Sequence, residues 1–321
     1  MMAIDKPNRQ PSESATATIP VMIIILTLNQ LEMTRRCLRA LFDTGNAEQA
    51  QVLLWDNGSQ DDTAESVRAE FPDVIVHAHA TNLGVAGGRN AAAALAMEVA
   101  GPSYLLFLDN DILVARGFVQ ALYETLERDR RVGQAQAKLR MMHDRTRLND
   151  GGGVRINFMR WQVALVGYGE LDQGQYDSLK PCPACEGGAT MVRADAFREL
   201  GGFDTHFNPY GPEDLDFSLR LQKAGYLAMY APQAVGYHAE SHTFGRGYSE
   251  EYARHKLRHW YRLMRRHASA LEQLGFFIFG APYLVLSVVV REGKRGNLGA
   301  VRGLMSGFLD LLRPAARGGG P

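Results

Sequence analysis

Two aspartates one residue apart, Asp109 and Asp111, directly follow the apolar run Leu105–Leu108. The run is the length of a buried strand and shorter than an ordinary helix. A buried parallel strand delivers its last residues to the carboxyl edge of a sheet, where open α/β folds bind ligands. Two carboxylates at that edge suit Mg²⁺ or Mn²⁺ held jointly with a substrate phosphate. An isolated Asp-x-Asp is also compatible with a polar turn that closes a strand, so its surroundings must decide.

Two further apolar runs end in polar side chains. Val21–Leu28 is followed by Asn29, and Gln51–Trp55 is followed by Asp56. Both runs read as short, fully buried strands. Because the carboxyl ends of parallel strands meet at one edge of a sheet, we expect these side chains to lie near the Asp-x-Asp pair.

The elements that must position these residues alternate between strands and helices. The expected strands are 21–28, 51–55, 74–77, 104–108, 132–139, 186–192 and 226–231, and the expected helices are 29–42, 63–70, 91–99, 116–128, 194–200 and 212–224. We expect Asp62 to cap the second helix, residues 82–90 to form a loop, and residues 140–185 to form a β-rich insertion. This alternation predicts right-handed βαβ units in an α/β fold with a mostly parallel central sheet.

The composition is that of a folded protein without an overall charge. The chain has 321 residues, and its 35 basic and 35 acidic side chains cancel. This balance gives no reason to expect nucleic acid as a partner. Residues 251–321 nevertheless hold 12 Lys and Arg against 4 Asp and Glu, which leaves 23 against 31 for residues 1–250. An acidic body with a basic tail suits a metal-dependent catalytic domain beside a membrane, although solvated helix faces would give the same division.

Three cysteines, Cys37, Cys182 and Cys185, are too few for a disulfide framework, so we expect a cytoplasmic protein. Cys182 and Cys185 form a C-x-x-C without a second pair to complete a zinc site. Pro181 and Pro183 make this segment a stiff loop, with a zinc or redox site as alternatives.

Seven short motifs occur in the order found in family 2 glycosyltransferases of the GT-A fold, which the chain resembles over about Val21–His242. The motifs are ILTLN (25–29), WDNGSQDDT (55–63), NLGVAGGRN (82–90), FLDNDI (107–112), GGFD (201–204), GPEDLDFSLR (211–220) and a later histidine. Bacterial rhamnosyltransferase-like members are the branch we favour. The resemblance implies a catalytic domain over 20–248, with a nucleotide-binding half over about 20–111 and an acceptor half over about 112–248.

The resemblance also implies a site for a nucleotide-sugar donor. Asp56 would accept a hydrogen bond from the ring N–H of uracil or thymine, and Arg89 would meet the nucleotide. An Asx-turn carboxylate and a surface arginine at a helix start are the alternative interpretations. Gly187 and Gly188 would leave room for the sugar against the backbone, or would form a buried turn. The full donor set is Thr27, Asn29, Asp56, Asn57, Asn82, Gly84, Arg89, Asp109, Asn110, Gly187 and Gly188.

The implied catalytic groups are a metal site and a base. Asp109, Asp111 and His238 would hold Mn²⁺ or Mg²⁺ at the diphosphate, with His242 as the alternative to His238. Asp214 would take the proton of the attacking acceptor hydroxyl in an inverting transfer, with Glu213 beside it. Acidic residues also suit the first turn of a helix, so capping would explain one or two of Glu213, Asp214 and Asp216.

The tail over 249–321 is basic and apolar. We expect a helix over 250–267 with aromatic side chains, then the apolar segment Phe276–Val290, which contains Pro282, and a last helix over 298–312. Spanning a membrane takes about 20 residues, so this segment is expected to lie at the interface. Packing against the catalytic domain or a second subunit is the alternative. Residues 1–19 are rich in Ser, Thr, Pro and Asn and are expected to be disordered.

The sequence therefore predicts a metal-dependent inverting glycosyltransferase of cell-envelope polysaccharide synthesis at the inner face of the plasma membrane. Its donor would be a UDP- or dTDP-sugar, with dTDP-rhamnose as one candidate, and its acceptor a hydroxyl of a glycan or a lipid-linked glycan. One alternative is a nucleotidyltransferase of similar fold, which would typically carry a glycine-rich triphosphate loop after the first strand. The other is a non-catalytic, membrane-associated nucleotide-sugar-binding protein, which would not need the acidic groups and the histidine together.

Overall fold

The computed structural model describes residues 20–239 and 249–312, which form two compact units. The first unit consists of residues 20–155, 164–209 and 213–239, and the second of 156–163, 210–212 and 249–312. Residues 1–19, which we expected to be disordered, and His242 lie outside the described residues.

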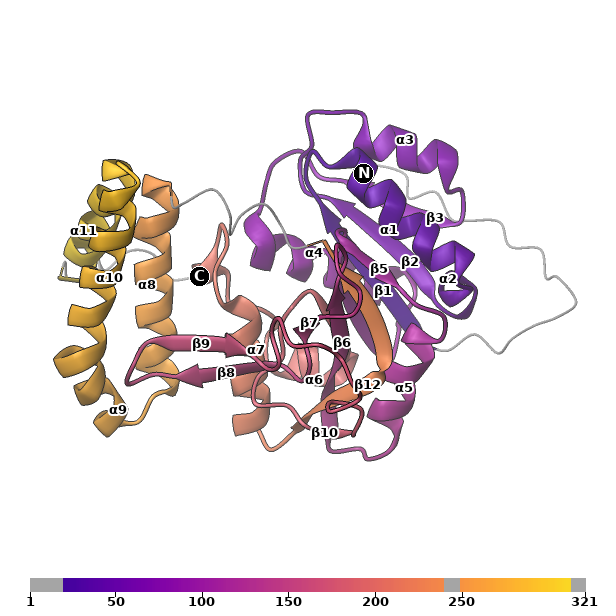
Figure 1. The fold of residues 1–321 in the computed structure, drawn as a ribbon. Coiled ribbons are helices and arrows are strands. Elements are labelled where there is room, and N and C mark those ends of the chain that lie inside the picture. Colours follow the sequence, from indigo (N-terminus) through magenta and orange to yellow (C-terminus); the bar gives the residue numbers. More distant parts are fainter. Residues whose placement is uncertain (1–19, 240–248, 313–321) are drawn as a thin grey trace, which may run out of the picture. The chain divides into compact units, whose positions relative to one another are not determined.

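The first unit is built on one sheet of ten strands (Figure 1). Its main strands are β1 (Val21–Thr27), β2 (Gln51–Asp56), β3 (Val74–Ala78), β4 (Tyr104–Asp109), β6 (Val132–Met141), β11 (Ala189–Arg193) and β12 (Leu227–His238). With the short β10 (Lys180–Pro181) at one edge, the order is β10-β12-β6-β11-β4-β1-β2-β3. β11 is antiparallel to both β4 and β6, so those two run in the same direction. β1, β2, β3 and β12 share that direction, which confirms a mostly parallel sheet.

The alternation of side chains along β1 explains why the sheet is covered on both faces. Ile23 and Ile25 pack in a core with α1 (Leu31–Asp43), α2 (Asn46–Gln49), α3 (Thr63–Glu70) and α5 (Phe118–Glu127). Met22 and Ile24 pack in the opposite core with α4 (Gly84–Val99), α6 (Ala194–Glu199) and α7 (Glu213–Lys223). The predicted α/β fold is therefore confirmed.

The region 140–185 is β-rich, as predicted. β7 (Leu148–Asp150) pairs with β6, and β8 (Val154–Asn157) pairs with β9 (Gln162–Leu165) in a separate hairpin. A buried ion pair holds this region to the sheet, because Lys138 Nζ on β6 lies 3.0 Å from Asp172 Oδ2 and both side chains are 2% exposed.

Three predicted boundaries and one predicted helix cap are wrong. The helix after β1 begins at Leu31 because Asn29 has a positive φ of 53°, which a right-handed helix does not accommodate at a residue other than glycine. Asp61, rather than Asp62, accepts the backbone hydrogen bond of Thr63 at the start of α3. The supposed loop 82–90 is mostly the first turns of α4. The strand expected to end at residue 231 continues to 238, because its end pairs with β5 (Ile112–Val114).

The early start of α4 has a tertiary cause. Asn208 accepts hydrogen bonds from the backbone N–H groups of Ala86 at 3.1 Å and Gly87 at 3.4 Å. Together with Asn82, whose Oδ1 accepts the Gly84 N–H at 2.8 Å, it caps the helix, because the N-cap residue Leu83 has no side-chain acceptor. Gly88 allows close packing, since a Cβ there would lie 2.7 Å from Leu26 Cδ1.

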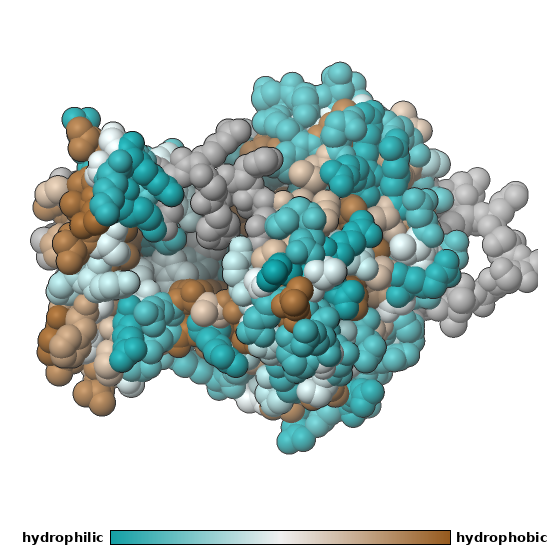
Figure 2. All heavy atoms as spheres, viewed as in Figure 1, coloured by the Kyte–Doolittle hydropathy of each residue, from teal (hydrophilic) through white to brown (hydrophobic). Residues whose placement is uncertain are grey.

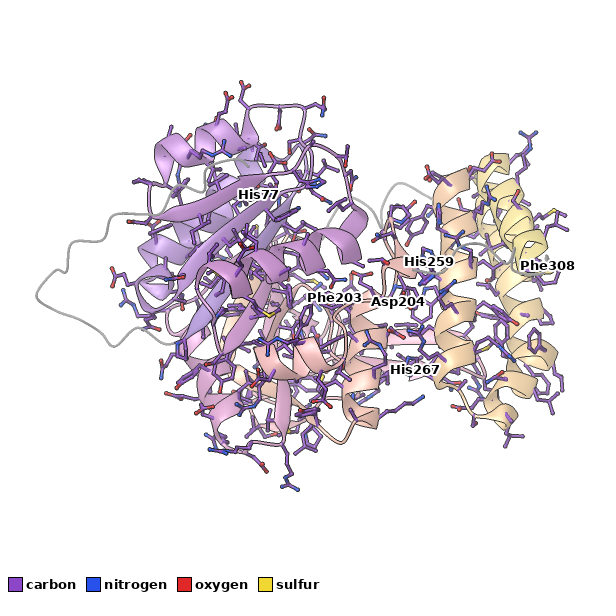
Figure 3. All side chains as sticks on the ribbon, turned by 180° about the vertical axis from the view of Figure 1, so that it is seen from behind. His77, Phe203, Asp204, His259, His267 and Phe308 are labelled. Atoms are coloured by element: carbon purple, nitrogen blue, oxygen red, sulfur yellow. The ribbon has the colours of Figure 1, made fainter. Side chains whose placement is uncertain are left out.

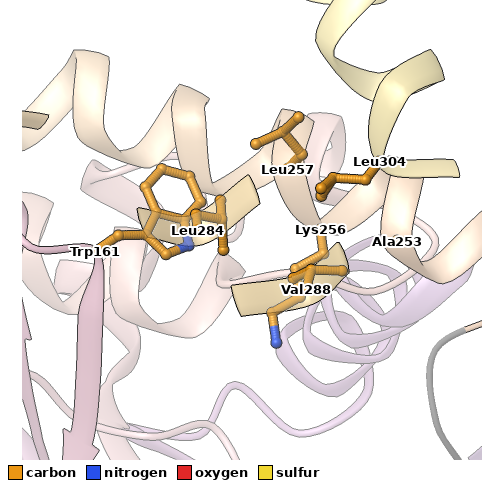
Figure 4. Close-up of a pocket in the computed structure, with 7 residues that line it drawn as sticks. All are labelled: Trp161, Ala253, Lys256, Leu257, Leu284, Val288 and Leu304. Atoms are coloured by element: carbon orange, nitrogen blue, oxygen red, sulfur yellow. The ribbon is translucent and has the colours of Figure 1, made fainter. Parts of the chain in front are cut away.

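The second unit contains the tail helices α8 (Glu250–His267), α9 (Ala270–Gly275), α10 (Ala281–Lys294) and α11 (Leu298–Leu312). A π-helical turn, Phe276–Gly280, joins α9 to α10. Leu257, Val288 and Leu304 form the core of this unit and line a small apolar pocket with Trp161 and Leu284 (Figure 4). His259 on α8, labelled in Figure 3, contacts the backbone carbonyl of Tyr210.

Residues Ala270–Lys294 make one continuous helical stretch of 25 residues, and its most apolar 18-residue window has a mean hydropathy of 1.9. The predicted 15-residue apolar segment is part of this longer stretch. Pro282 lies in the first turn of α10, directly after the π-helical turn Phe276–Gly280. By its length and composition, this stretch is long and apolar enough to cross a membrane. Figure 2 shows hydrophobic side chains gathered over these helices. The large exposed ones are Leu271, Leu274, Phe277, Ile278, Phe279, Tyr283, Val285, Leu286, Val289, Val290, Leu298, Met305, Phe308 and Leu309.

Candidate active site

The Asp-x-Asp pair lies in the turn between β4 and β5, at the carboxyl edge of the sheet. Because β5 pairs antiparallel with the end of β12, His238 is opposite Ile112. This pairing places His238 Nε2 3.4 Å from Asp111 Oδ2. Burial disfavours the charged imidazole, but the hydrogen bond and charge of Asp111 raise the pKa of His238 to about 9. Asn149 Oδ1 lies 3.0 Å from the other ring nitrogen, Nδ1.

Arg89 on α4 lies between the carboxylates of two other elements. Its guanidinium is buried and forms ion pairs with Asp109 Oδ1 at 2.7 Å and Glu213 Oε1 at 3.3 Å. The alternative of a surface arginine is therefore wrong. A buried arginine charge needs such partners, so Arg89 links α4 to the Asp-x-Asp turn and to the start of α7.

Asp214 lies beside this ion-pair network at the start of α7. Its Oδ2 accepts the Gly187 N–H at 2.7 Å, and its Oδ1 accepts the Leu215 N–H at 2.7 Å. Each oxygen retains a second lone pair for a substrate hydroxyl. Burial raises the pKa of Asp214, while Arg89 and the two backbone N–H groups oppose the shift. Burial and the neighbouring Asp214 raise the pKa of Glu213 to about 8.

Gly187 and Gly188 allow close packing in this part of the site because they have no side chain. A Cβ on Gly187 would lie 2.4 Å from Arg89 Nη1 and 3.0 Å from Asp214 Cβ. The Gly188 carbonyl accepts the Asp109 N–H at 2.7 Å. The backbone of Gly187 and Gly188 therefore contacts both the Asp109 backbone and the Asp214 carboxylate.

The predicted nucleobase residues lie together at the ends of β1 and β2. Asp56 Oδ1 accepts the Ser59 N–H at 2.9 Å, so the Asx-turn interpretation is correct for one carboxylate oxygen. Asn29 donates its N–H to Ser59 Oγ and accepts the Gln60 N–H. Asp56 is 3% exposed. Its second oxygen has no hydrogen bond to any of the residues that the structure describes.

Other members of the predicted donor set bind the protein itself. Thr27 Oγ1 shares a buried cluster with Thr34 Oγ1 at 2.8 Å and with the Asn110 amide at 3.2 Å. The Asn57 amide donates to Asn82 Oδ1 at 2.9 Å and to the Gly84 carbonyl at 3.1 Å, which shapes the turn before α4. These hydrogen bonds stabilise the loops at the carboxyl edge of the sheet. That the same side chains contact a donor stays a prediction.

Asp216 is separate from the other two acidic residues of α7. It is fully buried and accepts from Arg220 Nε at 2.7 Å. Arg220 in turn donates to the carbonyls of Leu200 and Gly202, which form the turn before Phe203 and Asp204 (Figure 3). Asp216 therefore has a structural role in this geometry.

The sequence interpretation missed Asn208 and Glu186. Asn208 lies between the motifs GGFD and GPEDLDFSLR and belongs to neither, and no local signal connects it to α4. Glu186 directly precedes the glycine pair and lies close enough to Asp214, Asp109 and His238 to feel their charges. An acidic residue directly before Gly187 and Gly188, the glycines predicted to leave room for the sugar, is a signal in the sequence that could have identified Glu186 as a site residue.

Asp111 and His238 fit a divalent cation, because a carboxylate and an imidazole facing each other are good Mn²⁺ ligands. Asp109 faces Arg89 instead, and within residues 20–239 and 249–312 no three His, Cys, Asp or Glu side chains converge as a complete ligand set. Two protein ligands suffice where substrate phosphates supply others. Cys182 and Cys185 are buried free thiols.

A family model described as glycosyl transferase family 2 matches residues 22–201, more than half of the chain. The chain belongs to glycosyl transferase family 2. A second model, described as the N-terminal domain of galactosyltransferase, matches residues 174–243. The first match contains Arg89, Asp109 and Asp111, and the second contains Asp214 and His238, so both cover parts of the site.

Named relatives of this family 2 glycosyltransferase agree with that assignment. An N-acetylglucosaminyl-diphospho-decaprenol L-rhamnosyltransferase of Mycobacterium tuberculosis is 28% identical over 232 residues, covering 68% of this chain and 75% of that protein. Glycosyltransferase AglE of Haloferax volcanii is 25% identical over 226 residues, covering 70% of this chain and 68% of that protein.

Solved structures show the same fold. The structure of GalNAc-T7 with UDP, GalNAc and Mn²⁺ superposes with a TM-score of 0.60 at 16% identity, covering 78% of this chain and 48% of that one. The chain thus spans about half the length of that structure. A mannosyltransferase of Pyrobaculum calidifontis in complex with GDP-Man and Mn²⁺ gives a TM-score of 0.55 at 19% identity, covering 97% and 80%. The family 2 glycosyltransferase therefore has a GT-A-like fold.

Proposed function

We propose that this family 2 glycosyltransferase is a metal-dependent, inverting enzyme that uses a UDP- or dTDP-sugar. The observation that carries the proposal is the Asp214 carboxylate, oriented by the Gly187 N–H next to the Arg89–Asp109 ion pair. A carboxylate held at one edge of a sheet beside a polar site is the geometry required of a base.

In the proposed reaction Asp214 accepts the proton of the acceptor hydroxyl as its oxygen attacks the anomeric carbon. The backbone N–H groups of Gly187 and Leu215 orient the carboxylate. Arg89 offsets the negative charge of Asp109 and Glu213 where an anionic diphosphate must approach. Attack opposite the leaving group inverts the anomeric centre.

Asp111 and His238 are the residues that would hold the divalent cation. When bound, Mn²⁺ or Mg²⁺ acts as a Lewis acid that offsets charge on the leaving nucleoside diphosphate. Structures of similar fold contain Mn²⁺ together with UDP or GDP-Man, which supports both the metal and a nucleotide-linked donor.

Asp56 supports uracil or thymine as the base of the donor, because a carboxylate accepts from the N3–H that cytosine lacks. The name of the mycobacterial relative supports a deoxyhexose donor and a lipid-linked acceptor. We therefore propose dTDP-rhamnose as the first donor to test, and a hydroxyl of a polyprenol-linked glycan as the first acceptor.

We further propose that the tail attaches the enzyme to the inner face of the plasma membrane. The exposed apolar side chains of α9, α10 and α11 support this, as do Arg291, Lys294 and Arg295 at the end of α10. Apolar burial combined with basic flanks is the usual basis of interfacial attachment.

The first test is a thermal-shift panel with UDP, dTDP, GDP, CDP and NAD, each with and without Mn²⁺. A ligand at 100 times its dissociation constant adds about 2.7 kcal/mol of stability. We expect UDP or dTDP to stabilise the protein only with Mn²⁺. A response to NAD alone, or equal responses with and without Mn²⁺, would contradict the proposal.

A further inference from the structure

Glu186 is an acidic residue at the site with one carboxyl oxygen that no described residue hydrogen-bonds. Its backbone N–H donates to Gln136 Oε1 at 2.8 Å, which anchors the residue to β6. Its Oε2 is buried and has no hydrogen-bond partner among the described residues. A buried polar oxygen in this state calls for a further hydrogen-bond partner.

Two neighbouring side chains share this property. Gln136 is fully buried, and its Nε2 lacks an acceptor within the residues that the structure describes. Asp150 on β7 is also fully buried. Its Oδ1 accepts the N–H groups of Gly152 and Gly153, whereas its Oδ2 has no partner in the same described ranges. The described residues thus leave two carboxyl oxygens and one amide NH₂ group without a hydrogen-bond partner.

The charges around Glu186 indicate what could satisfy these atoms. Burial and the charge of Asp150 raise the pKa of Glu186 to about 8, and Asp214 and Asp109 add to the repulsion, whereas His238 opposes it. A phosphate would be repelled by Asp150, Asp214 and Asp109, the same charges that raise the pKa of Glu186. A cation would leave the Gln136 amide without an acceptor. A hydroxyl both donates and accepts, so adjacent hydroxyls match the three atoms.

We propose that Glu186, together with Gln136 and Asp150, binds ring hydroxyls of a sugar next to the base and so determines which sugar is used. This inference rests on the proposed function. Glu186 is bonded directly to Gly187, whose N–H holds Asp214. A ring held by Glu186 therefore lies beside the base. The hydroxyls could belong to the transferred sugar or to the acceptor sugar, which present the same chemistry.

The test uses Glu186→Ala, with Glu186→Gln as the conservative variant and Asp195→Asn as the control. Asp195 lies on α6 with its side chain 92% exposed. Binding of dTDP and UDP with Mn²⁺ is compared with binding of dTDP-rhamnose, UDP-glucose and UDP-GlcNAc. Donor hydrolysis is then compared with transfer to octyl β-N-acetylglucosaminide.

For a donor-sugar subsite, Glu186→Ala weakens nucleotide-sugar binding and slows donor hydrolysis at least tenfold, without changing nucleoside diphosphate binding. For an acceptor subsite, donor binding and hydrolysis stay unchanged, and the KM for the octyl glycoside rises at least tenfold. Glu186→Gln should recover part of either loss, because an amide oxygen still accepts from a hydroxyl. Less than a twofold change in every sugar-dependent measurement would overturn the inference. Failure of the wild-type protein to bind any nucleoside diphosphate would instead count against the proposed function.

Discussion

At the scale of the residue, Asp214 is the group on which the proposed chemistry depends. We expect Asp214→Asn to lower the transfer rate about 10² to 10⁴-fold, because an amide does not take up the acceptor proton. Binding of UDP or dTDP with Mn²⁺ should stay within twofold of wild type by calorimetry. Unchanged turnover would remove Asp214 as the base, and Asp195→Asn provides the matched carboxylate-to-amide control.

The same substitution has a measurable structural cost. An asparagine offers one acceptor oxygen to the two N–H groups of Gly187 and Leu215. One hydrogen bond to a charged acceptor is lost, which costs about 1.5–3 kcal/mol. We expect urea denaturation of Asp214→Asn to show a loss smaller than this, because a neutral amide is easier to bury than a carboxylate. A larger loss would contradict this account.

The pH dependence of transfer should report the pKa of the same base. Burial raises the pKa of Asp214, so the base is protonated at a pH where an ordinary aspartate is ionised. We expect kcat/KM to fall with decreasing pH through a pKa above about 3.9, the ordinary value of aspartate. Arg89→Gln removes a positive charge that lowers the pKa of Asp214. In this variant the fall of kcat/KM should therefore occur at a higher pH. A shift to lower pH would contradict the assignment.

At the scale of the element, α4 depends on a cap from a distant part of the chain. Asn208→Ala leaves the N–H groups of Ala86 and Gly87 without their acceptor, and it removes the donor to the Leu83 carbonyl at 2.7 Å. We expect a loss of about 1–2 kcal/mol in unfolding free energy. Asn208→Asp keeps the accepting oxygen and should lose less. Equal losses for the two variants would show that the cap is not the cause.

The segment before β11 is a second element whose packing serves the site. A Cβ in Gly187→Ala must displace Arg89, whose Nη1 would lie 2.4 Å away. We expect kcat to fall at least tenfold, because the displaced groups belong to the site. The melting temperature should change little. Gly293→Ala on α10 is the control, since its Cβ meets nothing within 4 Å. Wild-type kcat in Gly187→Ala would show that Arg89 can move without cost.

At the scale of the whole molecule, the tail should carry membrane attachment. We expect the full chain to sediment with vesicles that contain anionic lipid, and the double substitution Phe279→Ser and Leu286→Ser to weaken binding at least tenfold. Their side chains are 65% and 64% exposed. Leu171→Ser and Leu227→Ser change exposed apolar residues of the first unit, at 45% and 37%, and should leave binding unchanged. Equal binding by both double variants would contradict the proposed surface.

The sequence by itself determined the α/β fold, the principal strands and the family. Continuous apolar runs such as Val21–Leu28 and Leu105–Leu108 report burial directly, because a strand covered on both faces has no polar side. The polar residues after those runs marked the carboxyl edge of the sheet. The last helix, Leu298–Leu312, was also predicted with its observed bounds.

Only the tertiary structure decided what those polar residues contact. Arg89 reaches Glu213 across 124 positions, Asn208 caps α4 across 122, and β5–β12 pairing brings His238 to Asp111. Periodicity and turn residues are local signals, so they locate an element without specifying its partner. Contacts between remote residues depend on the path of the chain, and the site is made of such contacts.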